Sequence, residues 1–213
     1  MKIKWWGHAS FTITTASGTK IVTDPYNEDL PYKPIDDRVD LVTVSHDHFD
    51  HNAVSSLPGT PRVIKDIEGF ENEEIKIKGI ESFHDDQSGE ERGSNIIFTY
   101  QVDDMKLCHL GDLGHPLNEK QFEHLKDIDV LLIPIGGHFT IDADQAYEIV
   151  KQLEPIVVIP MHYKTDILDF PIKGVDKFLK HFGEKSIIRV NGPEVEFSSL
   201  PFVQQIYVPD YVK

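Results

Sequence analysis

The chain has 213 residues and a formal net charge of −15, from 21 Lys and Arg against 36 Asp and Glu. This length suits one domain, and an acidic surface repels the phosphate backbone of nucleic acids. The single cysteine, Cys108, excludes an intrachain disulfide and favours a reducing, cytoplasmic location. No apolar run has the length of a membrane span, and we expect no signal peptide, because the first residues lack an apolar core. The unusual feature is the number of histidines, which is 11.

Short runs rich in β-branched and aromatic residues alternate with turn residues along the chain, which predicts many strands. The near-continuous apolar run over residues 40–45 is typical of a strand that is covered on both faces. Strands are predicted over residues 3–6, 10–15, 19–23, 40–45, 74–77, 80–83, 94–101, 106–110, 130–135, 156–159, 186–190, 195–197 and 203–208.

The clearest helix is predicted over residues 142–153. Asp142 can cap its N-terminus, and Gln145 stands three residues later, as in a capping box. Apolar side chains then recur on one face at helical spacing, at Ala143, Ala146, Tyr147, Val150 and Leu153. Shorter helices are predicted over residues 118–125 and 175–182. The whole chain, residues 1–213, is therefore predicted to be one α/β domain with many strands and few helices.

Three histidines and two acidic residues that can bind metal lie within six residues, directly after the apolar run at 40–45. The first and third positions after a strand share a side, so His46 and His48 can converge on one ion. Asp50 and His51 can face a second ion from the turn that follows. Imidazole nitrogens and carboxylate oxygens suit zinc, manganese, iron and cobalt. A solvated polar loop is the alternative, but it gives no reason to cluster so many protonation sites.

The pattern His-x-His-x-Asp-His after a buried strand resembles the signature of the metallo-β-lactamase superfamily. Further segments resemble its small single-domain members, the branch of ascorbate-6-phosphate lactonase-like metal-dependent hydrolases. These segments are residues 6–10 (Trp-Gly-His-Ala-Ser), 23–25 (Thr-Asp-Pro) and 159–163 (Ile-Pro-Met-His-Tyr). The resemblance implies a four-layer αββα sandwich of two mixed β-sheets, whose pseudo-two-fold halves meet near residue 100. The sparse helices indicate thin outer layers.

The resemblance also implies a dinuclear metal site, with three ligands for each ion and one shared carboxylate. The implied ligands of the first ion are His46, His48 and His84. The implied ligands of the second ion are Asp50, His51 and His162. Asp112 would bridge the two ions, and Asp50 or Asp112 would orient the nucleophile and pass its proton to the leaving group. Both Asp112 and His162 follow apolar predicted strands, at whose ends active-site residues gather.

Two positions separate this chain from other classes within the superfamily. Diiron redox members typically carry Glu where this chain has His48, so His48 favours hydrolysis. The best-known β-lactamases place a Cys where this chain has Asp112. Cys108 stands four positions away, inside a predicted strand, where we expect it to pack as a small hydrophobe. An antibiotic-degrading role is therefore disfavoured.

Some of the remaining histidines are candidates for the same site. His8 follows Gly7 at a predicted hairpin, where it either partners a ligand carboxylate or caps its own turn. His138 follows a buried strand, so its loop is expected to face the site and contact substrate. His115, in a Gly-His-Pro sequence, is a further candidate. The others are expected to be structural or solvated, and they are His109, His124 and His181.

We predict a cytoplasmic metal-dependent hydrolase that uses a metal-bridging hydroxide on a small anionic ester, lactone or phosphate ester. Two divalent ions, with zinc preferred over manganese, iron or cobalt, would create a positive spot for a small-molecule substrate on an acidic protein. The alternatives are a phosphodiesterase or nuclease of the same superfamily, and a metal-binding protein without turnover. The acidic composition and the absence of a basic stripe argue against long nucleic acids and membrane surfaces as partners. The sequence leaves the oligomeric state open.

Overall fold

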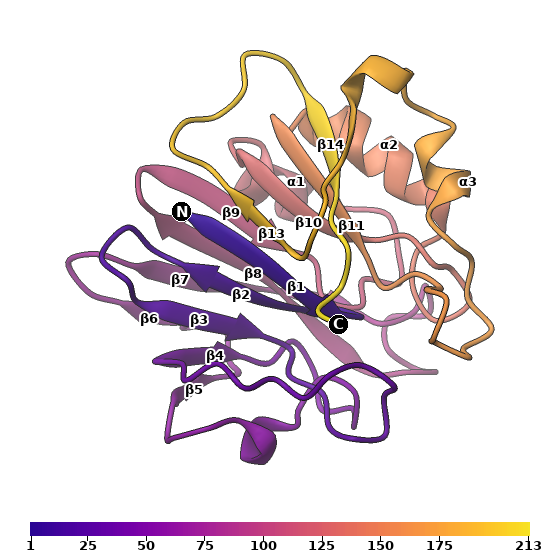
Figure 1. The fold of residues 1–213 in the computed structure, drawn as a ribbon. Coiled ribbons are helices and arrows are strands. Elements are labelled where there is room, and N and C mark those ends of the chain that lie inside the picture. The colour runs from indigo at the N-terminus through magenta and orange to yellow at the C-terminus, as the bar shows by residue number, and fades with distance from the viewer.

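The computed structural model describes residues 1–213, and its strands form two mixed β-sheets (Figure 1). The six-stranded sheet has the order β13-β1-β2-β3-β4-β5. Its strands are β1 (Lys2–Gly7), β2 (Ser10–Thr14), β3 (Lys20–Thr23), β4 (Leu41–Thr43), β5 (Arg62–Ile64) and β13 (Glu194–Glu196). The pairs β3–β4 and β4–β5 are parallel, and the other pairs of this sheet are antiparallel.

The eight-stranded sheet has the order β12-β14-β11-β10-β9-β8-β7-β6. Its strands are β6 (Phe70–Glu71), β7 (Lys76–Phe83), β8 (Ser94–Val102), β9 (Met105–His109), β10 (Val130–Pro134), β11 (Val157–Met161), β12 (Ile187–Arg189) and β14 (Gln205–Val208). The strands from β12 to β9 are parallel, and those from β9 to β6 are antiparallel. The predicted α/β class with two mixed sheets is confirmed.

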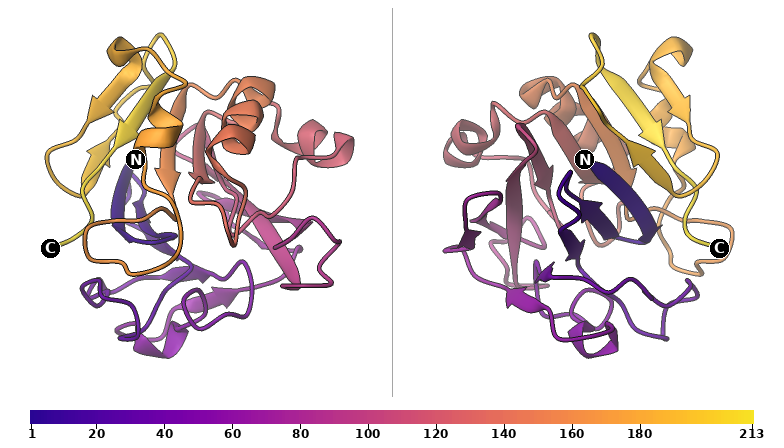
Figure 2. Two further views of the ribbon diagram at one scale, coloured as in Figure 1. Left: turned by 90° about the vertical axis from the view of Figure 1, so that its right-hand side faces the viewer. Right: turned by 60° about the vertical axis from the view of Figure 1, so that its left-hand side comes forward.

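Three short α-helices lie on the outer side of the eight-stranded sheet (Figures 1 and 2). They are α1 (Glu119–Leu125), α2 (Ala143–Leu153) and α3 (Asp176–Leu179). The predicted capping box of α2 is present, because Asp142 accepts hydrogen bonds from the N–H groups of Asp144 and Gln145, and Gln145 accepts one from the Asp142 N–H. No helix is long and apolar enough to cross a bilayer.

The outer face of the six-stranded sheet is covered by irregular chain and one 3-10 turn, Val54–Ser56, and by no α-helix. The loop between β3 and β4 supplies the apolar cover, with Tyr26, Leu30, Tyr32, Ile35 and Val39 all buried. These side chains pack with residues of the sheet itself, Trp6, Val22 and Val42. The loop thus removes apolar surface from water without a helix, and the expected outer layer is thin on this side.

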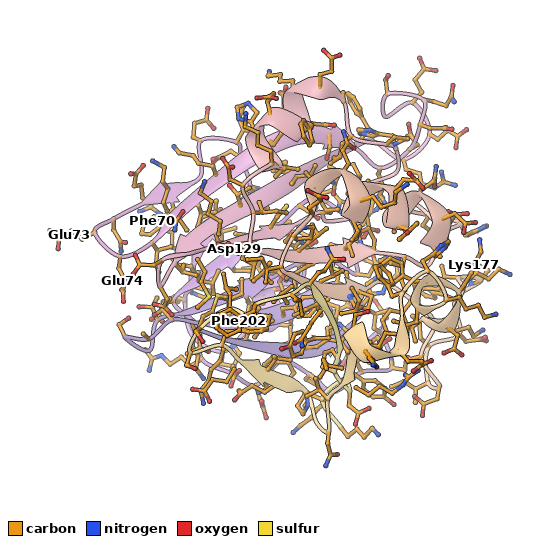
Figure 3. All side chains as sticks on the ribbon, turned by 90° about the horizontal axis from the view of Figure 1, so that it is seen from above. Phe70, Glu73, Glu74, Asp129, Lys177 and Phe202 are labelled. Carbon is orange, nitrogen blue, oxygen red and sulfur yellow. The ribbon has the colours of Figure 1, made fainter.

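The main core lies between the two sheets and extends under the helices. All five residues of β10 are buried, as expected for a parallel strand with both faces covered. Cys108 is fully buried within β9, and His109 beside it is also buried and within hydrogen-bonding distance of the Ala9 carbonyl, 2.8 Å from Nε2. Both residues thus have the structural roles that the sequence predicted. At the periphery, Glu73, Glu74 and Lys177 project from the edges of the molecule (Figure 3).

The structure departs from the predicted elements at a few places. The two strands predicted over residues 74–77 and 80–83 form one strand, β7 (Lys76–Phe83), which begins two residues later than predicted and runs through Gly79. A Cβ at Gly79 would lie 2.7 Å from the Ile67 Cα, so the missing side chain lets the preceding segment cross the strand closely. The short strands β5 and β6 were not predicted, and β14 begins at Gln205, after an exposed Val203.

Candidate metal centre

The histidines and aspartates of the candidate site lie just beyond the C-terminal ends of strands from both sheets. Residues 46–51 follow β4, and His84, Asp112 and His162 follow β7, β9 and β11. Two further buried residues, His8 and Asp24, follow β1 and β3. The fold therefore brings together at one end of the sandwich the seven residues that the resemblance implied as ligands.

The centre of this cluster is the carboxylate of Asp112. Its Oδ2 lies 3.3 Å from His51 Nε2, 3.2 Å from His84 Nε2 and 3.1 Å from His162 Nε2. Donor atoms that share a tetrahedral ion at about 2.0–2.1 Å are separated by roughly 3.3 Å, so these spacings match those of ligands around common ions. One carboxylate oxygen thus faces imidazoles from both predicted ligand sets.

On one side of Asp112, the ligating atoms of His46, His48 and His84 all lie within 4.8 Å of one another. The Nδ1 atom of His46 is 2.8 Å from the Ser45 hydroxyl oxygen, which leaves Nε2 free for this group. The side chain of Ser45 therefore sets the orientation of the ring.

On the other side, His51 is held by Asp24. The His51 Nδ1 atom lies 3.0 Å from Asp24 Oδ2, and its Nε2 points toward Asp112 and toward Asp50 Oδ2, which is 3.9 Å away. A hydrogen bond from Nδ1–H to a carboxylate fixes the tautomer and leaves the Nε2 lone pair for an ion. The ligating atoms of His51, His162 and His8 lie within 4.8 Å of one another, and Asp50 stands beside this group.

His8 belongs to the same buried cluster. Its Nε2 lies 3.2 Å from Asp50 Oδ2, and its ring centroid is 4.0 Å from that of His162. Of the two roles considered from the sequence, this geometry matches a partner of a ligand carboxylate. The backbones of His8, Asp24 and His162 have φ values of 53°, 38° and 49°, and such left-handed non-glycine residues gather at functional sites.

Several buried polar atoms in the cluster have no hydrogen-bond partner. They include the Nε2 atoms of His46 and His51 and the Oδ1 atom of Asp112. Leaving a buried polar atom unpaired costs about 1–3 kcal/mol, so such atoms require an explanation. Divalent ions would satisfy the two Nε2 atoms, and a donor set made only of nitrogen and oxygen suits zinc and similar metals.

The electrostatics of the cluster favour the metal-binding form for some side chains and the protonated form for others. Despite burial, Asp112 and Asp24 raise the pKa of His51 well above its usual value, and Asp112 raises the pKa of His84, so a bound ion would displace a proton from each of these imidazoles. Burial, together with the charge of His51, lowers the pKa of His46 to about 3, so its imidazole is neutral at pH 7. Burial and the proximity of His84 also lower the pKa of His48. Burial alone would raise the pKa of Asp112, but His162 and His51 lower it well below its usual range. Neutral imidazoles and an ionised carboxylate are the forms that bind metals.

Asn95 fixes the backbone of Asp112, and the sequence interpretation missed it. Its Oδ1 accepts a hydrogen bond from the Asp112 N–H at 3.0 Å, and its Nδ2 donates to Ser82 Oγ at 2.7 Å and to the Leu110 carbonyl at 3.0 Å. The sequence signal that could have identified Asn95 is a polar amide side chain within the strand predicted over residues 94–101. The supporting residue Asp24 had a clearer signal in the Thr-Asp-Pro segment.

The cluster opens into a hollow of about 320 Å³. Its walls combine polar and aromatic residues, which are His48, Phe49, Asp50, His84, Arg92, Asp112, Phe139, His162 and Phe170. A larger hollow of about 560 Å³ lies between β7 and α1, but no cluster of metal-binding side chains lines it. The smaller hollow is therefore the one next to the candidate chemistry.

The two histidines that were predicted only as candidate substrate contacts, His138 and His115, do not line this hollow. His138 is exposed and packs against the ring of Phe139, and it is Phe139 that faces the hollow. His115 lies beside β7, where its Nε2 accepts a hydrogen bond from the Phe83 N–H at 3.2 Å. His124 is exposed, as expected, but His181 pairs with Asp144 at 2.9 Å and stacks on Tyr147.

Comparisons with known proteins identify the family of the chain. Residues 2–162 match the model of the beta-lactamase superfamily domain. A UPF0173 metal-dependent hydrolase of Thermoplasma acidophilum is 32% identical over 192 residues, covering 78% of this chain and 84% of the relative. The crystal structure of a protein from Thermotoga maritima, assigned as a zinc-dependent hydrolase of the metallo-β-lactamase superfamily, is 40% identical, with a TM-score of 0.83 and 99% of each chain covered. Igni18, a metallo hydrolase from Ignicoccus hospitalis, is 25% identical over 84% of this chain and 89% of its own, with a TM-score of 0.66.

Proposed function

The chain belongs to the metallo-β-lactamase superfamily as one of its metal-dependent hydrolases, and on this premise we propose that it hydrolyses a small anionic ester, lactone or phosphate ester with two divalent ions. The observation that carries the proposal is the contact of Asp112 Oδ2 with three imidazoles, at 3.1–3.3 Å. A single carboxylate oxygen between two sets of buried imidazoles is the arrangement expected of a bridging ligand.

In this proposal each ion has its own ligands and Asp112 is shared. His46, His48 and His84 would hold the first ion, and Asp50, His51 and His162 would hold the second. Zinc is the preferred metal, because imidazole and carboxylate donors suit it and the relative from Thermotoga maritima is assigned as zinc-dependent.

When bound, two such ions polarise the scissile group and lower the pKa of a water molecule toward neutrality. The residues of the chain orient the reaction. Asp50 lines the hollow with an ionised carboxylate, since the hydrogen bond with His8 and the charge of His51 hold its pKa below the usual range despite burial. Asp50 orients the attacking water and transfers a proton to the leaving oxygen, while His8 fixes the position of Asp50 from 3.2 Å.

Hydrolysis assays on metal-loaded protein test this function. Bis-(4-nitrophenyl) phosphate, a panel of lactones and a panel of aryl esters would be offered to protein stripped with a chelator and then reloaded with zinc or manganese. We expect turnover of at least one class that is lost with the metal and restored with it, and two equivalents of metal by mass spectrometry. Protein that holds two metals and turns over none of these substrates would contradict the proposal.

A further inference from the structure

Arg92 is the one Lys or Arg side chain that lines the hollow beside the metal-binding cluster. It lies in the loop between β7 and β8, and its side chain is 33% exposed. Its present partner is Glu91, whose Oε2 lies 3.1 Å from Arg92 Nη1 and whose side chain is 58% exposed. Such an exposed ion pair contributes little free energy, so it competes weakly with a bound anion.

The loop that carries Arg92 is fixed by a buried carboxylate. Asp85 accepts four backbone hydrogen bonds, from the N–H groups of Gln87 and Gly89 at 2.8 Å, Glu91 at 3.1 Å and Arg92 at 2.7 Å. The backbone of Arg92 is therefore held before any ligand arrives. A cation on a fixed backbone loses less conformational entropy on binding than one on a free loop.

Three phenylalanines also line the hollow. Phe139 and Phe170 come from the loops after β10 and β11, and their ring centroids are 6.1 Å apart in an edge-to-face arrangement. Phe49, from the segment between His48 and Asp50, is 56% exposed. Phe139 and Phe170 are half-buried. Together these three rings form a surface for an apolar group of a ligand beside the polar centre.

We propose that Arg92 binds a carboxylate remote from the scissile bond, and that the substrates are small carboxylate-bearing esters or lactones with an apolar group. A guanidinium pairs with a carboxylate through two parallel hydrogen bonds, and one Arg with no second Lys or Arg matches a single negative charge better than a phosphate dianion. This inference rests on the proposed hydrolase function. Water adds across the acyl C–O bond, its oxygen joins the acyl carbon, and a proton goes to the departing oxygen, while the carboxylate on Arg92 is unchanged.

The test compares two esters of equal chain length on the metal-loaded protein. Mono-(4-nitrophenyl) succinate carries the carboxylate, and 4-nitrophenyl butyrate lacks it. We expect the wild type to prefer the succinate ester in kcat/KM by about tenfold or more, and Arg92→Gln to remove that preference mainly by raising KM. Arg92→Lys keeps the charge without the bidentate geometry, so it should have an intermediate preference.

Arg38→Gln is the matched control, because Arg38 is an exposed arginine outside the hollow. It should keep the wild-type preference. A wild type without preference for the succinate ester, or Arg92→Gln with an unchanged preference, would overturn the inference. A preference for a phosphorylated alkyl ester over the succinate ester would also overturn it.

A binding measurement separates this inference from the hydrolase function. If the wild type hydrolyses neither ester, succinate itself is titrated into metal-loaded protein by calorimetry. Succinate binding that is about tenfold weaker in Arg92→Gln than in wild type supports the role of Arg92, even though the protein does not hydrolyse these esters. The absence of succinate binding, or equal binding by both proteins, rejects the role of Arg92.

Discussion

The carboxylate of Asp24 accepts a hydrogen bond from His51 at 3.0 Å in the fully buried interior of the site. The same carboxylate accepts hydrogen bonds from the N–H and the hydroxyl of Ser45, at 2.7 Å and 2.6 Å. Ser45 in turn contacts His46. Asp24 therefore orients histidines of both proposed ligand sets, although it belongs to neither set.

Replacing Asp24 should weaken metal binding. In Asp24→Asn the amide cannot accept all of these hydrogen bonds, so the His51 ring loses its fixed tautomer. We expect metal affinity to fall about 10–100-fold, as measured by competition with a chromophoric chelator. Asp40→Asn is the control, because Asp40 accepts a backbone hydrogen bond from Lys20 on the exposed side of β3. Equal affinities in Asp24→Asn and wild type would refute the positioning role.

Removing the bridging carboxylate should cost both metal and activity. In Asp112→Ala the buried imidazoles lose their common partner, so we expect fewer than two equivalents of metal and a loss of turnover of at least about 10²-fold. Elemental analysis after dialysis gives the first value, and circular dichroism checks the fold. Asp127→Ala, at an exposed position, should keep both metals. An Asp112→Ala protein with two metals at full occupancy would show that the bridging assignment is wrong.

Asp85 should matter for substrate preference through the loop of Arg92. Its four backbone donors lower its pKa to about 2, although removal from water would raise it, so the side chain is an anion at neutral pH. Asn offers one acceptor oxygen, and Asp85→Asn therefore releases part of the loop. We expect the succinate-over-butyrate preference to fall about 3–10-fold and trypsin to cleave after Arg92 faster. The neighbouring exposed Asp86, changed to Asn, should behave as wild type; equal loss in both variants would argue against the anchor.

The ion pairs of Asp37 with Lys4 and Lys20 predict how part of the folding stability depends on pH. Asp37 is 18% exposed and lies 3.2 Å from Lys4 Nζ and 3.3 Å from Lys20 Nζ. Partial burial would raise its pKa, but hydrogen bonds and charge from the two lysines lower it below the ordinary value of 3.8. The stability from this group is therefore present above about pH 4 and is lost as pH falls through the lowered pKa.

Urea unfolding of wild type and Asp37→Asn measures this effect. The wild type should be more stable by about 1 kcal/mol at pH 7, and the difference should shrink below pH 4. Acid effects on the metal-binding cluster act on both proteins and cancel in the difference. Asp36→Asn, with an exposed side chain, is expected to show no such trend. A difference that is constant from pH 7 to pH 3 would exclude the ion pairs as its cause.

Local patterns predicted the elements and residues whose signals are contiguous in sequence. The capping box of α2 and the segment from His46 to His51 depend on spacings of a few residues, and the structure has both as local features. The buried run before His46 also predicted that this segment starts at a strand end, since a strand covered on both faces has few other positions for polar residues.

Contacts between distant parts of the chain could not be predicted in this way. The hydrogen bond between Asn95 and Asp112 joins residues 17 apart, and the pair of His8 and Asp50 joins residues 42 apart. The sequence pattern also could not predict the direction in which a loop side chain points. The left-handed backbone of His138, with φ of 65°, turns its ring outward and leaves Phe139 to face the hollow. Such directions depend on turn geometry, which composition does not encode.

The reaction of Cys108 with a thiol reagent can report local opening of the eight-stranded sheet. The residue lies in the middle of the eight-stranded sheet, between Thr99 of β8 and Leu131 of β10, and burial raises the pKa of its thiol. A thiol reagent can therefore reach it only after these strands separate. Because it is the only thiol of the chain, the labelling rate under native conditions counts openings of the strand that leads directly to Asp112. Comparing the labelling rates with and without metal thus measures how much bound ions suppress the opening of this strand.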